Sequence, residues 1–188
     1  MSDQKELIAK VLQGDAKAQK ELYDAHAGIM LAVCYRYSKS LADAEDMLQE
    51  GFVKVFRNLK QYKGIGDLGG WIRRIMVNTI INEIKKSKIP LTQLDSTAEN
   101  EIPTPADDVE IQLTAKEIAE LIKKLPVGYG IVFNLHAIEG YSHKEIAAML
   151  NIKTVSVRSQ YQRARTQLIK WIEKEKTSLA QKHVENGK

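Results

Sequence analysis

The chain has 188 residues, of which 44% are hydrophobic and 6% aromatic, and its formal net charge is +4. This composition predicts a core-forming protein of one ordinary domain or two small ones, built on aliphatic side chains. A single cysteine, Cys34, excludes an internal disulfide, and no apolar run reaches the roughly 18 residues of a membrane span. The first ten residues are polar and do not resemble a secretory signal, so we expect a cytoplasmic protein without membrane insertion.

Charge divides the chain into three parts. Residues 1–86 carry a net charge of +3, residues 87–110 carry −5, and residues 111–188 carry +6. The acidic part also holds three of the four prolines and a stretch rich in Ser, Thr and Asn, which cannot bury enough apolar area to offset chain entropy. We therefore expect a domain at 1–86, a flexible linker at 87–109, a domain at 110–176 and a tail at 177–188.

The first domain shows only helical patterns. Residues 41–62 place apolar side chains at helical spacing, a glycine-dense loop follows at 63–70, and a second helix is expected over 71–86. The second helix has an apolar side and a polar side that carries Trp71. That ring is placed either to stack on an unpaired base or to pack on a neighbouring helix. Strand-like alternation is not found, so the predicted fold class is all-α.

The segment 142–171 carries the most specific pattern, that of a helix-turn-helix. Ser142 and Glu145 form a capping box, and the small Ala147 is suited to a close helix crossing. Asn151 can adopt the left-handed conformation of a tight turn, and Val157 follows as an aliphatic plug. These offsets predict two helices joined by a short turn.

The second helix of this motif has a polar side suited to the major groove, although a solvated surface would also explain its charges. A helix-turn-helix alone would fit a dimeric regulator with a sensory first domain. It would also fit a nuclease or recombinase with an appended helix-turn-helix. Carboxylates such as Asp43 and Glu45 could be misread as the active site of such an enzyme. No metal-ligand spacing, phosphate-binding loop or nucleophile–base set is recognisable, so we expect neither a cofactor nor enzymatic activity.

Three segments together resemble one family. DAEDMLQEGFVKVF at 43–56 resembles region 2.2 of sigma factors, and WIRRIMVN at 71–78 resembles the helix that follows it and reads the −10 promoter element. Residues 129–168 resemble region 4 of the extracytoplasmic-function (ECF) group of the sigma-70 family. The resemblance implies a non-enzymatic promoter-recognition subunit that is monomeric when free. Its implied partners are the core of bacterial RNA polymerase, promoter DNA and an anti-sigma factor.

The resemblance also implies roles for individual residues. On the polymerase core, contacts are implied with the clamp helices of the largest subunit and with the flap of the second largest. The positions that match the clamp-helix contacts are Asp46, Gln49 and Glu50. The positions that match the −10 loop and helix, or lie on the helix's polar side, are Lys63, Gly64, Ile65, Gly66, Asp67, Leu68, Trp71, Arg74, Asn78, Asn82 and Lys85. The −35 element would be read by the polar side of the last helix, with Arg158, Ser159, Gln162, Arg163 and Thr166.

Some positions depart from the family pattern. Asp67 stands where a small hydroxyl residue is common, and Val155 replaces a frequent glycine before the last helix. Gly130 stands where a basic residue is typical. We also expect Gly69 and Gly70 to loosen the entry to the −10 helix.

Overall fold

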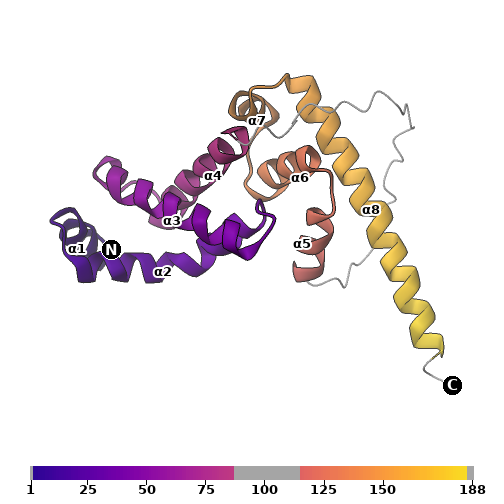
Figure 1. Cartoon of the computed structure of the whole chain (residues 1–188), viewed down its shortest axis with the longest axis horizontal. Helices are drawn as coiled ribbons and strands as arrows, with labels where there is room; N and C mark the ends of the chain where they lie inside the picture. Colours follow the sequence, from indigo (N-terminus) through magenta and orange to yellow (C-terminus); the bar gives the residue numbers. More distant parts are fainter. Residues whose placement is uncertain (1, 87–114, 186–188) are drawn as a thin grey trace. The chain divides into compact units, whose positions relative to one another are not determined.

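The computed structural model describes residues 2–86 and 115–185, and every element within these ranges is helical (Figure 1). The chain divides into two compact units, residues 1–89 and 90–188. The prediction of an all-α protein with two small domains is therefore confirmed. The linker predicted at 87–109 lies outside the described residues.

The N-terminal unit consists of α1 (Ser2–Leu12), α2 (Ala16–Tyr35), α3 (Leu41–Asn58), the short 3-10 helix η1 (Leu59–Gln61) and α4 (Leu68–Lys86). Helices α2, α3 and α4 pack on one another around a core of aliphatic side chains and Phe52. Gly51 faces Met76 at the crossing of α3 and α4, where an added Cβ would overlap the methionine sulfur. The absence of a side chain at residue 51 therefore allows α3 and α4 to pack closely.

Local signals define the helix starts of this unit. The Asp15 carboxylate accepts hydrogen bonds from the backbone N–H groups of Lys17 and Ala18, and Ser40 forms a capping box with Asp43. Cys34 is fully buried, and desolvation raises the pKa of its thiol to about 11. This environment is typical of a small apolar core residue and not of a reactive thiol.

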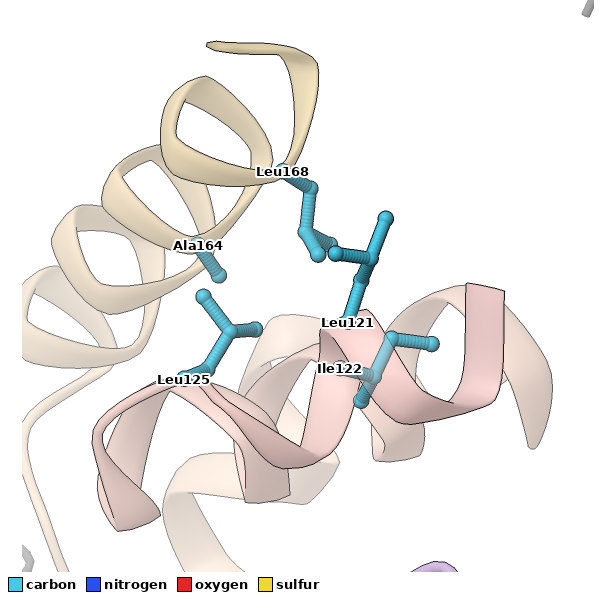
Figure 2. Packing of buried hydrophobic residues seen from close by; sticks show 5 residues of the cluster. All are labelled: Leu121, Ile122, Leu125, Ala164 and Leu168. Carbon is cyan, nitrogen blue, oxygen red and sulfur yellow. The ribbon is translucent and has the colours of Figure 1, made fainter. Parts of the chain in front are cut away.

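The C-terminal unit consists of α5 (Ala115–Lys123), α6 (Val127–Phe133), the π-helical turn η2 (Asn134–Ile138), α7 (His143–Leu150) and α8 (Thr154–Glu185). Part of its core joins the end of α5 to α8. Figure 2 shows the side chains in this contact, namely Leu121, Ile122, Leu125, Ala164 and Leu168. Helix α6 packs along α8 as well, so α8 is the element on which the unit is assembled.

Helix α8 reaches Glu185 and so includes residues of the tail predicted at 177–188 (Figure 1). One helix start differs from the predicted one. Helix α4 begins at Leu68 and not at Trp71, so two glycines expected in the loop belong to the helix. The reason for this difference is the side chain of Asp67, as described below.

Candidate nucleic-acid interface

The first candidate surface is one face of α3. Asp46 and Gln49 are both exposed, and Val53, one turn further along the same face, is 45% exposed. Glu50 lies to the side, half-buried, and accepts a hydrogen bond from Lys54 Nζ at 2.6 Å. This hydrogen bond is the main reason that the pKa of Glu50 is lowered. Asp46 and Gln49 are thus presented outward, whereas Glu50 is engaged within its own helix.

Asp46 and Glu50 also border a hollow of about 360 Å³ beside α3. Its lining includes Tyr37 after α2, Met47 on α3 and Glu83 on α4. Sequence patterns could not place these three residues together, because they come from separate segments. Val53 was not among the predicted contact residues because it is an aliphatic residue on a polar face, although its helical spacing from Gln49 places it on the same face.

The second candidate surface begins with the glycine loop between η1 and α4. Gly64 and Gly66 have φ angles of 71° and 80°, and between them Ile65 is 81% exposed. The Tyr62 hydroxyl donates a hydrogen bond to the Gly66 carbonyl oxygen at 2.8 Å, and the Tyr62 and Trp71 rings lie 5.6 Å apart. The hydrogen bond joins the two ends of the loop, and Trp71 packs against Tyr62 with part of its surface still accessible.

Asp67 begins α4. Its Oδ2 accepts a hydrogen bond from the Gly70 N–H at 2.7 Å, and its carbonyl oxygen accepts one from the Trp71 N–H at 3.1 Å. Gly69 and Gly70, which were expected to loosen the helix entry, are helical here, and the carboxylate satisfies a free N–H group of the first turn. A Cβ at Gly69 would lie 2.9 Å from this carboxylate oxygen, so the glycine leaves room for the cap.

The same helix start corrects one predicted contact. Leu68 was expected among the DNA-binding residues, but its side chain is 2% exposed and belongs to the core. The four polar residues predicted on this side of α4 are exposed, as expected. Arg74, Asn78, Asn82 and Lys85 are exposed on the side opposite the buried aliphatic residues of the helix.

We predict that Asp67→Ala lowers the free energy of unfolding of the N-terminal unit by about 0.5–2 kcal/mol, because the first turn of α4 loses its cap. Asp67→Ser removes the charge but keeps a side-chain acceptor, so it should retain most of the stability. Urea denaturation of the full chain followed by Trp71 fluorescence in a Trp171→Phe background measures both. Equal losses in the two variants would show that capping is not the role of Asp67.

The third candidate surface is the helix-turn-helix formed by α7 and α8. The capping box is confirmed, since Ser142 N–H donates to Glu145 Oε2 at 2.8 Å and Glu145 N–H donates to Ser142 Oγ at 3.3 Å. Asn151 ends α7 in the left-handed conformation, with φ 55° and ψ 47°. Val157 is fully buried, as the motif requires.

The two departures in this unit do not disturb the motif. Val155 is 73% exposed on the first turn of α8, so it meets no neighbour that would distort the turn. Gly130 is buried in α6, where an added Cβ would lie 3.4 Å from the Ile122 carbonyl oxygen. A basic side chain at this position would start inside the domain and not at its surface.

The polar side of α8 is only partly open. Arg158 and Gln162 are exposed, and Ser159 and Thr166 are half-buried. Arg163 is half-buried too, and its Nη1 donates a hydrogen bond to the Tyr129 hydroxyl at 3.1 Å, which ties α8 to α6. Arg158 and Gln162 are therefore the best placed to meet a ligand, and Arg163 has an additional structural contact.

Within residues 2–86 and 115–185, no group of three or more His, Cys, Asp or Glu side chains is arranged to hold a metal ion. None of the helices in these ranges combines the length and apolar character needed to cross a bilayer.

Two family models match the chain in sequence order. The model "Sigma-70 region 2" matches residues 22–89, and the model "Sigma-70, region 4" matches residues 115–168. The first match contains α3, the glycine loop and α4, and the second contains α5 through the exposed start of α8. The three candidate surfaces therefore lie inside the matched regions.

Three proteins with similar sequences are ECF sigma factors. The chain is 30% identical to the ECF RNA polymerase sigma factor SigW of Bacillus subtilis over 88% of its own length and 95% of SigW. It is 30% identical to the ECF sigma-E factor of Escherichia coli K12, with 85% and 88% covered. A third relative, SigE of Mycolicibacterium smegmatis, is 31% identical, and the chain spans 64% of its length.

Among solved structures, the sigma factor RpoE of Bartonella quintana, in complex with the anti-sigma factor NepR, has the same fold, with a TM-score of 0.51 at 18% identity. The match covers 82% of this chain and 96% of RpoE. Both sigma regions are present in the family order, and the sequence matches extend over most of the chain. The chain therefore belongs to the ECF RNA polymerase sigma factors of the sigma-70 family, which are non-catalytic transcription initiation factors.

Proposed function

We propose that this sigma factor directs RNA polymerase to two-part promoters, with the N-terminal unit binding core polymerase and the −10 element and the C-terminal unit binding the −35 element. The observation that carries the proposal is the presence of three exposed polar faces, on α3, α4 and α8, at the positions that match the family's contact residues. The sigma factor acts in the cytoplasm, where polymerase and promoters meet.

The α3 face is proposed to bind core polymerase. Asp46 supplies a carboxylate, Gln49 supplies an amide and Val53 supplies an apolar contact on one side of the helix. Such a mixed surface can form both polar and apolar contacts with a protein partner, and the proposed partner is the clamp helices of the largest polymerase subunit. The flap of the second largest subunit is the proposed partner of the C-terminal unit.

The glycine loop and α4 are proposed to bind the −10 element as a single strand. Arg74 and Lys85 are placed to neutralise phosphates, while Asn78 and Asn82 offer both hydrogen-bond donors and acceptors to base edges. Trp71 and the exposed Ile65 lie at the loop, where stacking on an unpaired base is worth about 1–3 kcal/mol. Lys63, Gly64, Gly66 and the Asp67 backbone complete this surface.

The helix-turn-helix is proposed to read the −35 element as a duplex. Residues near the start of a recognition helix usually contact base edges in the major groove. Arg158 and Gln162 lie on the first turns of α8 with exposed side chains, and Arg is well suited to guanine and Gln to adenine. Ser159, Arg163 and Thr166 are proposed to support this contact from the flank.

Regulation by an anti-sigma factor is also proposed. The RpoE structure of Bartonella quintana contains the anti-sigma factor NepR. A comparable partner of this chain would prevent initiation by covering the α3 face around Gln49 or the α8 face around Arg163. Without such a partner we expect the free chain to be monomeric.

We predict that the free chain binds promoter duplex weakly and that core polymerase makes the binding tight. Each unit carries half of the site, and fixing their spacing on polymerase would turn two weak contacts into one bivalent contact, with a gain of roughly 10²–10⁴ in affinity. Fluorescence anisotropy of a promoter fragment at physiological salt, with the chain alone, core alone and both, measures this gain. Tight and specific binding by the chain alone would contradict it.

A further inference from the structure

Four rings meet where η2, α7 and α8 come together, and we call them the histidine cluster: Phe133, His136, His143 and Tyr161. The imidazoles of His136 and His143 are stacked, with centroids 4.2 Å apart and planes inclined by 29°. Tyr161 lies edge-on to His136 at 4.6 Å and tilted to His143 at 5.7 Å. Phe133 stacks on Tyr161 at 5.9 Å. The cluster thus joins four elements of the C-terminal unit, α6, η2, α7 and α8, and two of its rings are imidazoles.

The hydrogen bond of His136 identifies which of its ring nitrogens carries a hydrogen. His136 Nδ1 lies 2.8 Å from the Tyr141 carbonyl oxygen, which can only accept, so Nδ1 carries the hydrogen. A further proton on His136 would add at Nε2. His143 Nε2 is buried, and no described residue forms a hydrogen bond with it. A proton placed on that nitrogen would find no acceptor, which makes the charged form of His143 costly.

His136 and Arg158 also disfavour a positive charge on His143. His136 faces it from η2, Tyr161 and Arg158 face it from α8, and its neighbours on α7 are Lys144 and Glu145. The Glu145 carboxylate accepts a hydrogen bond from the Ser142 N–H in the capping box. The pKa of His143 is lowered, first by desolvation and then by His136 and Arg158. The surroundings therefore favour the neutral ring.

We propose that the histidine cluster is a pH-sensitive joint of the helix-turn-helix, in which neutral rings hold η2 and α7 against α8 and mild acid loosens them. Two imidazolium rings at stacking distance repel each other, so the stack cannot persist when both are charged. Tyr161 lies on α8 between Arg158 and Gln162 in sequence, so loosening this contact disturbs the start of the proposed recognition helix.

The pH range follows from the sign of the shift. A histidine whose pKa is lowered in the folded state is neutral in both states well above 6.5, and there the stability is complete. As the pH falls below about 6.5, the unfolded chain takes up the proton first, so the C-terminal unit loses stability. The loss continues until the pH reaches the lowered value of the folded state.

His143→Phe provides the test, because it keeps an aromatic ring in the stack and removes the titrating group. The control is His26→Gln, which removes a histidine from the N-terminal unit. Thermal unfolding of the full chain, followed by NMR through the buried methyl groups of Val132, Leu135 and Val157, reports on the C-terminal unit at pH 7.5 and 5.5. We expect the wild type and His26→Gln to lose unfolding temperature in acid, and His143→Phe to lose less than half as much. Equal acid losses in all three chains would overturn the proposal.

Direct titration of the wild type keeps the proposal testable if the phenylalanine variant does not fold. The imidazole chemical shifts of His143 should show protonation only below about pH 6.5, with the stacking contact to His136 lost in the same step. Protonation of His143 at the ordinary histidine pKa, with the stack retained, would overturn the proposal.

The consequence for promoter recognition rests on the proposed function and is measured separately. With core polymerase, the ratio of transcripts from promoters with intact and scrambled −35 elements should fall between pH 7.5 and 6.0 for the wild type but not for His143→Phe. A ratio that changes equally in both chains contradicts the joint. Failure of the chain to support initiation at pH 7.5 would count against the proposed function, while the unfolding and titration results would still decide on the cluster.

Discussion

Replacing both Asp46 and Gln49 with alanine is expected to abolish most chain-dependent initiation. The two side chains are exposed on one face of α3 and are proposed to become buried against the polymerase clamp helices. Truncating one partner of a buried, hydrogen-bonded charge pair costs about 2–5 kcal/mol. A loss in this range weakens binding to core polymerase by roughly 30-fold or more.

Binding of fluorescently labelled chain to purified core polymerase measures this effect, and run-off transcription measures its consequence. Gln13→Ala with Asp24→Ala is the matched control, because it removes the same two side-chain types from exposed positions outside α3. Asp24 forms an exposed ion pair with Lys20, so its loss should cost little stability. Core binding that is unchanged in the Asp46→Ala, Gln49→Ala chain would remove the α3 face from the interface.

Replacing Arg158 and Gln162 with alanine is expected to remove discrimination at the −35 element while leaving core binding intact. Each specific side-chain contact with a base pair is worth about 1–3 kcal/mol. Losing both should therefore lower the preference for the correct −35 sequence by roughly 30-fold or more. Both side chains are exposed on α8, so the fold should tolerate their removal.

Competition between promoters with intact and scrambled −35 elements, transcribed by the reconstituted holoenzyme, measures this preference. Lys170→Ala is the control for the loss of a positive charge, since Lys170 is exposed on α8 about two turns beyond Gln162. The control should weaken both promoters equally if it has any effect. An unchanged preference in the Arg158→Ala, Gln162→Ala chain would exclude direct reading by these residues.

Local signals allowed the helix-turn-helix to be predicted from the sequence. The Ser142–Glu145 capping box and the left-handed Asn151 act within a few residues of the chain, and both are found in the structure. The polar sides of α4 and α8 also followed from helical spacing, because a helix turns by the same angle at every residue. These features depend little on the rest of the protein.

The helix start at Asp67 shows where local reasoning failed. Four glycines near this position favoured a loop up to residue 70. The Asp67 carboxylate caps the first turn, and Leu68 gains a buried position, so together they outweigh the cost of placing two glycines in a helix. Glycine content alone could not indicate that balance.

Contacts between distant residues could not be predicted either. The hydrogen bond from Arg163 to Tyr129 joins residues 34 positions apart, and helical spacing indicates only the side of α8 on which Arg163 lies. The stack of His136 on His143 depends on how η2 and α7 are joined. A helical wheel contains no information about either neighbour.

The central proposal is tested most directly by transcription from a randomised promoter library, using purified core polymerase with and without this chain. Sequencing the transcribed templates should reveal two constrained blocks at a fixed separation, and initiation should depend on the chain. Initiation that does not need the chain, together with a single symmetric site bound by the chain alone, would contradict the proposed function. That result would favour a conventional DNA-binding regulator.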